Sequence, residues 1–303
     1  CYVGSVLEHI EECGIHSGDS ACCWPPFSLS EKIVDQIRDI TKKLALACGI
    51  RGLLNIQYAV RDEHVFVIEL NPRASRTVPF SSKATGVSLA KYASRIMAGE
   101  KISELRAQGL LPDENRTVDY YAVKEAVMPW SRFPGADSIL GPEMKSTGEV
   151  MGIARTFPAA YAKTREAVEN KLPEQGSVFI SVCDRDKRAI APVAMALENL
   201  GYGIYTTGGT AKTLRAAGID CTTVNRISDG HPNVVDLMRD KTVSFIINTP
   251  HGHEAHSDGT KMRAEAVSQG ITCVTAMSAA TALIQALAAA RKSEPETFAL
   301  QDL

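Results

Sequence analysis

The chain has 303 residues, of which 45% are hydrophobic and 22% charged, and its formal net charge is −2. These values are typical of a soluble globular protein of about two domains. They exclude a global basic field of the kind that attracts nucleic acid or an anionic membrane. We therefore expect neither partner, and any phosphate site has to be local.

The eight cysteines are scattered and form no CxxC pair, which indicates reduced thiols in a cytoplasmic protein. The sequence contains no secretory leader pattern and no run of about 18 apolar residues that could span a bilayer. It begins with Cys1, directly in the strand-like segment 2–6, so we expect it to start inside a larger protein.

A small polar loop, residues 14–20, follows the acidic segment 8–12. Such a loop either wraps a ligand or a cation, or is a solvated turn in which Asp19 or Ser20 caps another element. Farther along, apolar residues recur every three or four positions over 33–48, which predicts an amphipathic helix ending at Gly49.

Two strand-like runs, 53–60 and 65–70, are joined by a short polar link. We expect a hairpin with a three-residue loop at 62–64. That register gives two polar pairs, Gln57 opposite Glu69 and Asn55 opposite Asn71. Buried polar groups cost free energy unless they are paired or bind a ligand, so the cluster is either a site or the wet face of an edge strand.

Glu69 and Asn71 lie two positions apart, so on a strand they point to the same face. Mg²⁺ takes oxygen ligands of this kind together with nucleotide phosphates. Arg73 and Arg76 follow directly, and their guanidinium groups suit the remaining phosphate charge. This segment therefore predicts a metal and phosphate site.

The segment 69–73, after a hairpin that carries Gln57, resembles the metal-binding end of an ATP-grasp domain. The longer run 71–86 resembles one family, the large subunit of carbamoyl-phosphate synthase, and residues 77–80 resemble its second half, which phosphorylates carbamate. The resemblance implies ATP with Mg²⁺ or Mn²⁺ as cofactors, and carbamate as substrate. It also implies a glutaminase small subunit that joins the full-length large subunit.

Residue by residue, the resemblance implies that Gln57, Glu69 and Asn71 bind the metal and that Arg76, with Arg73, contacts the transferring phosphoryl group. The family segment that lines the ATP site corresponds to Gly14, Ile15, His16 and Ser17, with Gln57 and Glu69 also on the nucleotide. Glu8, His9 and Asp19 fall where the family places a monovalent cation such as K⁺ and, in some members, an activator. For Glu125 we expect the role of a surface residue on a strand, and that of an activator ligand only as the second choice.

Strands are expected at 120–129 and in the segment up to 152, with a helix over 157–171 and a linker at 172–176. The predicted domains are 1–173, the C-terminal lobe of an ATP-grasp domain with an antiparallel sheet and helices, and 174–303. In the second domain short apolar strands alternate with helices, the pattern of a doubly wound parallel α/β sheet.

Ligands of such sheets bind at the carboxyl ends of the strands. The Gly-rich turn 207–210 lies at one of them, and glycines followed by a helix start suit a phosphate. The order of elements resembles a methylglyoxal-synthase-like regulatory domain. That resemblance implies a nucleotide effector such as UMP or IMP, bound by Lys187, Thr207, Thr210, Arg226 and Asn248. Pro250 departs from the family pattern and leaves the effector's identity open.

Three imidazoles and a carboxylate within 251–256 could in principle hold Zn²⁺, but their spacing fits no standard site and a polar loop is favoured.

The leading hypothesis is a C-terminal fragment of the synthase, inactive by itself, with homo-oligomer formation left open. The alternatives are a stand-alone effector-binding module and a phosphate-eliminating lyase, although the lyase's Gly-Gly-Asp loop is not found.

Overall fold

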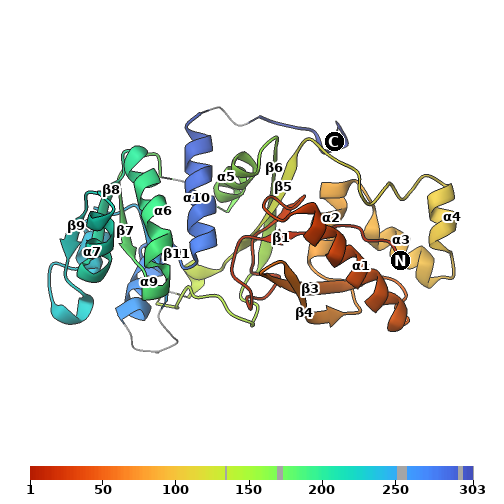
Figure 1. Ribbon diagram of the computed structural model, residues 1–303, viewed down its shortest axis with the longest axis horizontal. Coiled ribbons are helices and arrows are strands. Elements are labelled where there is room, and N and C mark those ends of the chain that lie inside the picture. The colour runs from red at the N-terminus through yellow and green to blue at the C-terminus, as the bar shows by residue number, and fades with distance from the viewer. Residues whose placement is uncertain (134, 169–172, 251–257, 293–295, 303) are drawn as a thin grey trace.

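The computed structural model describes residues 1–133, 135–168, 173–250, 258–292 and 296–302. The chain forms an antiparallel half, with a two-stranded ribbon beside it, and a parallel half (Figure 1). This is the predicted combination of an antiparallel lobe with a doubly wound domain. Among the described helices, none is long and apolar enough to cross a membrane.

The antiparallel half is built on a four-stranded sheet in the order β1-β2-β5-β6. Its strands are β1 (Glu8–His9), β2 (Cys22–Trp24), β5 (Tyr121–Val127) and β6 (Gly148–Ala154). The ribbon consists of β3 (Asn55–Arg61) and β4 (His64–Asn71). The helices of this half are α1 (Glu31–Ala47), α2 (Thr77–Thr85), α3 (Leu89–Met97), α4 (Ile102–Ala107) and α5 (Phe157–Ala167), with the 3₁₀ turn η1 (Trp130–Arg132).

Both faces of the four-stranded sheet are covered. On one face Phe80 of α2 packs with Trp24 and Ala122, and on the other Phe157 of α5 packs with Val123. Because successive strand residues point to opposite faces, both faces of β5 are buried, and this includes its two charged side chains, Lys124 and Glu125. Helix α2 lies within the run 71–86 that carries the family resemblance, and no helix was predicted there.

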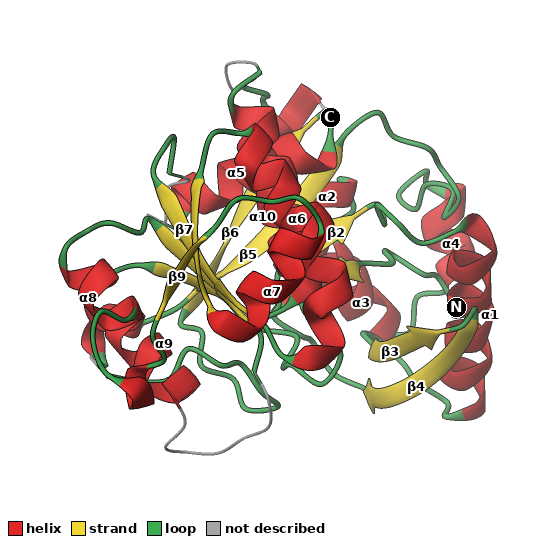
Figure 2. Ribbon diagram, turned by 60° about the vertical axis from the view of Figure 1, so that its left-hand side comes forward, coloured by secondary structure: helices red, strands yellow, loops and turns green. Residues whose placement is uncertain are grey.

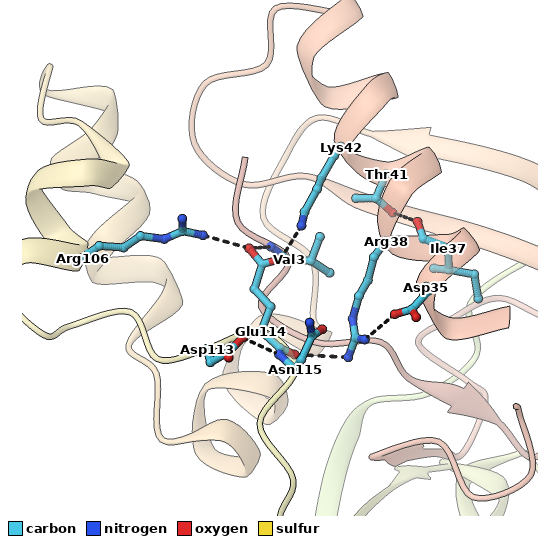
Figure 3. A network of polar contacts seen from close by, with 10 residues as sticks. All are labelled: Val3, Asp35, Ile37, Arg38, Thr41, Lys42, Arg106, Asp113, Glu114 and Asn115. Carbon is cyan, nitrogen blue, oxygen red and sulfur yellow. Dashed lines mark hydrogen bonds and ion pairs between the residues drawn. The ribbon is translucent and has the colours of Figure 1, made fainter. Parts of the chain in front are cut away.

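The N-terminal segment is not the strand expected at 2–6. The amide of Val3 donates to Oε1 of Glu114, 3.2 Å away, instead of to a neighbouring strand. The Glu114 side chain is 8% exposed and also pairs with Lys42 at 2.6 Å and Arg106 at 3.2 Å (Figure 3). One carboxylate thus ties the segment to α1 and α4.

The parallel half contains a five-stranded sheet in the order β11-β10-β7-β8-β9. Its strands are β7 (Ser177–Ser181), β8 (Gly203–Thr207), β9 (Thr222–Val224), β10 (Phe245–Asn248) and β11 (Thr272–Val274). Its helices are α6 (Lys187–Asn199), α7 (Gly208–Ala216), α8 (Val234–Arg239), α9 (Asp258–Ser268) and α10 (Met277–Ala290). The remaining 3₁₀ turns are η2 (Asp184–Asp186), η3 (Ile227–Asp229) and η4 (Leu300–Asp302).

Helices cover both faces of the parallel sheet, as Figure 2 shows. Side chains of α6, α7 and α10 share one core with β7, whereas α8 and α9 share the other. Chain order runs outward from β7 in one direction and restarts at β10 in the other, so the topological switch point lies between these two strands. Doubly wound sheets bind ligands at such a point.

Helix α10 belongs to two cores. Leu283 and Leu287 pack under the parallel sheet, while Ala282 and Ala286 pack with Phe157 of α5. The two helices lie side by side between the halves (Figure 1). The domain boundary at 173/174 therefore stays a prediction, because the second segment supplies part of the first segment's core.

Candidate functional site

The ribbon places the predicted metal ligands in the expected register. Gln57 lies opposite Glu69, and Asn55 lies opposite Asn71. The loop is nevertheless not the predicted one, since Arg61 pairs with His64 and only two residues form the turn.

The two turn residues, Asp62 and Glu63, have φ values of 50° and 61°. Positive φ at both central positions is the mark of a hairpin turn whose twist matches that of the strands. A bulge between Gln57 and Tyr58 then adds one residue on the opposing strand, Ile68. The prediction of a three-residue loop was wrong, but the bulge restores the register at the site.

The side chains on this face offer oxygen donors. Nδ2 of Asn71 donates to Oε1 of Glu69 at 2.8 Å, which turns the Asn71 carbonyl oxygen away from that bond. Glu69 is exposed, while Gln57 and Asn71 are partly buried. One carboxylate and two amide oxygens suit a hard divalent cation that completes its shell with phosphate and water. Among the described residues, no group of three or more His, Cys, Asp or Glu could hold a metal ion, so a cation here has to rely on the amides.

Beside the ribbon lies a cavity of ≈ 560 Å³, here called the N-terminal cavity. Seven predicted residues line it: Glu8, His9, Gly14, Ile15, Ser17, Gln57 and Arg73. His16, Glu69, Asn71 and Arg76 are not part of that lining. The cavity therefore brings together one metal ligand, one arginine and most of the polar loop, but not the whole predicted set.

The polar loop 14–20 is held by buried partners and is not a solvated turn. Asp19 is 2% exposed, and its two oxygens accept from the amides of Lys145 and Ser146 at 2.7 and 2.9 Å. The ammonium of Lys124, a fully buried side chain, donates to the Ser17 carbonyl at 2.9 Å. Nδ1 of His16 accepts from the Gly18 amide at 3.0 Å. The capping that the sequence suggested for Asp19 is real, and it fixes the loop.

Arg76 is the residue before α2 and points to the same buried loop. Its Nη1 donates to the hydroxyl of Ser146 at 3.0 Å and to the Ser146 carbonyl at 3.3 Å. Ser146 in turn donates to the Gly18 carbonyl at 3.0 Å. Arg76 is thus oriented by a backbone segment far from it in sequence, whereas Arg73 lines the cavity directly.

Two half-buried ionisable groups, His9 and Glu11, line the N-terminal cavity. Burial, followed by the nearby charge of Glu125, raises the pKa of Glu11 to about 8, and its Oε2 has no partner among the described residues. Burial, followed by the Lys124 charge, lowers the pKa of His9 to about 4. At neutral pH these groups are neutral.

Glu125 is not the surface residue that the sequence suggested. It is 9% exposed and lies 3.2 Å from Nη1 of Arg165, which is 8% exposed. Burial raises the pKa of Glu125, and the Arg165 charge opposes that effect. Glu8, another predicted cation ligand, accepts from the amides of Phe27 and Ser28 at 2.8 and 2.7 Å.

A second cavity, of ≈ 360 Å³, lies at the carboxyl ends of the parallel strands and is here called the switch-point cavity. All five predicted effector residues line it: Lys187, Thr207, Thr210, Arg226 and Asn248. They come from three strand ends and two helix starts, which only the folded topology brings together.

The polar groups of this cavity are largely pre-positioned. Thr210 is buried and its hydroxyl accepts from the Val182 amide at 3.4 Å. Nδ2 of Asn248 donates to the Ser181 carbonyl at 2.9 Å. Lys187 pairs with Asp184, and Arg226 is exposed. The lining holds three cationic side chains against the two carboxylates of Asp184 and Asp258, so the cavity is suited to an anion.

Arg263 also lines the switch-point cavity and was not predicted from the sequence. It is 3% exposed, and its Nη1 donates to Oδ1 of Asn248 at 2.8 Å. The only indication in the sequence was that Arg263 lies in α9, the helix that follows the strand ending at the predicted residue Asn248. The histidines of 251–256, considered above for Zn²⁺, lie outside the described residues.

Each half of the chain contains a segment that matches a known protein family. Residues 5–105 match the family described as the carbamoyl-phosphate synthase L chain, ATP binding domain, and residues 189–275 match the MGS-like domain. The carbamoyl phosphate synthase large chain of Acidobacterium capsulatum is 46% identical over 300 residues, which are 99% of this chain and 27% of that protein. The C-terminal section of the same large chain in Aquifex aeolicus is 45% identical over 308 residues, covering 97% of this chain and 57% of that protein.

The chain thus spans 27% of the full-length relative from Acidobacterium capsulatum. Among solved structures, the biotin carboxylase domain of a thermophilic 2-oxoglutarate carboxylase, bound to ADP, gives a TM-score of 0.39 at 19% identity. That match covers 52% of this chain and 40% of the other.

Proposed function

Because the chain corresponds over almost its whole length to the C-terminal section of the carbamoyl phosphate synthase large chain, we propose that it serves the ATP-dependent phosphorylation of carbamate. In this proposal residues 1–173 supply the metal side of the phosphorylating site, and residues 174–303 regulate it. The observation that carries the proposal is the register of Gln57 opposite Glu69, within the segment that matches the ATP-binding domain.

The ribbon would hold Mg²⁺ or Mn²⁺ through Gln57, Glu69 and Asn71, and the cation would neutralise nucleotide phosphate charge. Arg73, at the wall of the N-terminal cavity, is placed to bind phosphate oxygens. Arg76 takes part once its guanidinium is turned toward the nucleotide. Phosphoryl transfer needs positioning and charge neutralisation more than a covalent group from the protein, and this set provides both.

The switch-point cavity is proposed to bind a nucleotide effector such as UMP or IMP. Lys187 and Arg226 would take the phosphate, with Thr207 and Thr210 at the helix start. Asn248 would bond the ligand beyond the phosphate. The two cations and the buried Thr210 support an anionic ligand, and Pro250 in the lining leaves the base open.

The wider proposals follow from the relatives. The full-length large chain would act with a glutaminase small subunit in the cytoplasm, with carbamoyl phosphate serving arginine and pyrimidine synthesis. K⁺ is proposed near Glu8, His9 and Asp19, and a homo-oligomer is proposed by analogy with the family. The chain of 303 residues by itself is expected to make no carbamoyl phosphate.

Calorimetry with residues 1–303 tests the metal site. Mg²⁺ with ATP should bind in the wild type, and the Glu69→Gln variant should bind about tenfold more weakly, because one charged oxygen ligand is lost. Glu63→Gln at the same ribbon's turn is the matched control. Equal binding by wild type and Glu69→Gln would contradict the metal assignment.

A second candidate is an effector-binding module without catalysis, which the completeness of the switch-point cavity favours. UMP or IMP should then bind, and Thr210→Ala should weaken it, while ATP and Mg²⁺ give no heat. A lyase function is tested with dihydroxyacetone phosphate, from which no methylglyoxal is expected.

A further inference from the structure

Arg263 reaches from the switch-point cavity into the antiparallel half. Its Nη1 bonds Asn248 inside the parallel half. Its other two nitrogens form a two-pronged pair with the carboxylate of Asp137, Nε to Oδ1 at 2.6 Å and Nη2 to Oδ2 at 2.8 Å. Burial alone would raise the pKa of Asp137, but the bonds from Arg263 hold it below its usual value. One guanidinium therefore joins a predicted ligand residue to the other half of the chain.

Asp137 opens the segment 137–146, here called the connecting loop. The loop is braced within itself, since the Ile139 amide donates to Asp137 Oδ1 at 3.0 Å and the Lys145 ammonium to the Ile139 carbonyl at 2.7 Å. Gly141 accepts from the His16 amide at 2.8 Å. Movement of Asp137 would thus be carried along the loop.

The far end of the connecting loop holds the predicted catalytic elements. The amides of Lys145 and Ser146 bind Asp19 of the polar loop, and Ser146 accepts the bonds of Arg76. Ser146 is 5% exposed and Asp19 2% exposed, so water does not replace these bonds freely. The contacts run without a break from Asn248 to Arg76.

An anion in the switch-point cavity would compete with Asp137 for the same guanidinium. Arginine binds carboxylate and phosphate through the same planar fork, and Arg263 lies in the lining that Lys187 and Arg226 share. Asp137 occupies the fork that Nε and Nη2 of Arg263 form, while Nη2 also bonds Thr260 and Nη1 bonds Asn248. A phosphate therefore gains a two-pronged bond from Nε and Nη2 only as Asp137 loses it. Coupling between sites requires such a difference in contacts.

We propose that Arg263 is a further ligand-contacting residue of the switch-point cavity, and that its exchange between Asp137 and a bound phosphomonoester repositions Arg76 through the connecting loop. The inference rests on the proposed functions of the two cavities. The effect on Arg76 is a change of position only, because Arg76 contacts Ser146 and does not contact the ligand of the switch-point cavity.

The first test measures UMP and IMP binding by calorimetry with residues 1–303. Asp137→Asn removes the competing charge and should tighten binding about fivefold or more. Arg263→Lys keeps the charge but loses the fork, and should weaken binding about tenfold. A residue that only supports the fold would not give a tighter ligand on losing its partner, so unchanged or weaker binding by Asp137→Asn overturns the proposal.

The second test follows hydrogen exchange of the amides in 14–20 and 139–147 with saturating ligand. Exchange should change severalfold in the wild type and stay unchanged in Asp137→Asn, whereas Asp119→Asn, at another carboxylate that pairs with an arginine, should respond as the wild type does. Binding without a remote change overturns the coupling alone. Absence of UMP and IMP binding in the wild type instead overturns the effector function, and this inference with it.

Discussion

The switch-point cavity and the ribbon each present an asparagine to a proposed ligand, but they hold it differently. Asn248 is 6% exposed, and both ends of its amide are bonded, to Arg263 and to the Ser181 carbonyl. Asn71 lies on a two-stranded ribbon with Phe66 and Ile68 about half exposed nearby, and its amide nitrogen bonds Glu69.

This difference separates two ways of building a site. In the cavity the ligand-binding groups are also part of the fold, so altering them should change stability as well as binding. On the ribbon the groups are free of the core, so a change there should affect ligand binding alone. Burial of a polar group, rather than the half of the chain in which it lies, sets which case applies.

The largest expected effect tests that last point in the antiparallel half. Arg165→Met leaves the buried Glu125 without its guanidinium partner and beside Glu11, and should lower the free energy of unfolding by about 3–5 kcal/mol. Urea denaturation at pH 8 measures it. The double variant Arg165→Met with Glu125→Leu should recover most of the loss, and a single variant as stable as the wild type would break the comparison.

The next effect compares the two asparagines directly. Asn248→Ala leaves Arg263 Nη1 and the Ser181 carbonyl without their partner and should cost about 1–3 kcal/mol of unfolding free energy. Asn71→Ala is the matched control and should leave the denaturation midpoint almost unchanged. Equal losses from the two substitutions would remove the distinction between the sites.

A smaller effect concerns pH. Burial raises the pKa of Glu11 to about 8, so the folded state holds a proton that the unfolded chain releases, and stability falls as pH rises through that range. The loss between pH 7 and 8 should be ~1 kcal/mol. Burial lowers the pKa of His9 to about 4. Its imidazole is therefore largely neutral in both the folded and the unfolded chain above pH 7, and it adds almost no pH dependence to the unfolding free energy between pH 7 and 8. Glu11→Gln should abolish the slope, and a slope that persists would assign it to another group.

The smallest effect is expected at the ribbon's turn. Lys32 and Glu63 are 2.8 Å apart with side chains 65% and 72% exposed, and an ion pair in water gains little. Lys32→Gln should therefore give no resolvable shift of the thermal midpoint at 0.15 M salt. A clear loss of stability would mean that the ribbon is coupled to the core more tightly than its exposure indicates.

Much of the fold was predictable because the hydrophobic periodicity was clear and Gly and Pro residues marked the ends of the elements. The strands and helices of the parallel half alternate as the sequence predicts. The candidate residues of the switch-point cavity were found because strand ends of a doubly wound sheet converge. Helix α2 was missed, since its hydrophobic residues follow no strong helical stripe.

The contacts that could not be predicted are those between residues far apart in sequence. Glu125 was expected at the surface, and its partner Arg165 lies 40 residues away. Arg263 was missed because Asp137 lies 126 residues away. A hydrophobic pattern indicates which residues are buried, but not which buried charge meets which.

The ribbon's bulge has a consequence for how the hairpin can vary. A turn one residue longer, without the bulge at Ile68, would place Gln57 opposite Glu69 just as the present turn does with it. Length changes at the tip can therefore be absorbed along the strand before they reach the metal ligands. The number of residues in the turn can therefore differ between homologues while the pairing of Gln57 with Glu69 at the base of the hairpin stays the same.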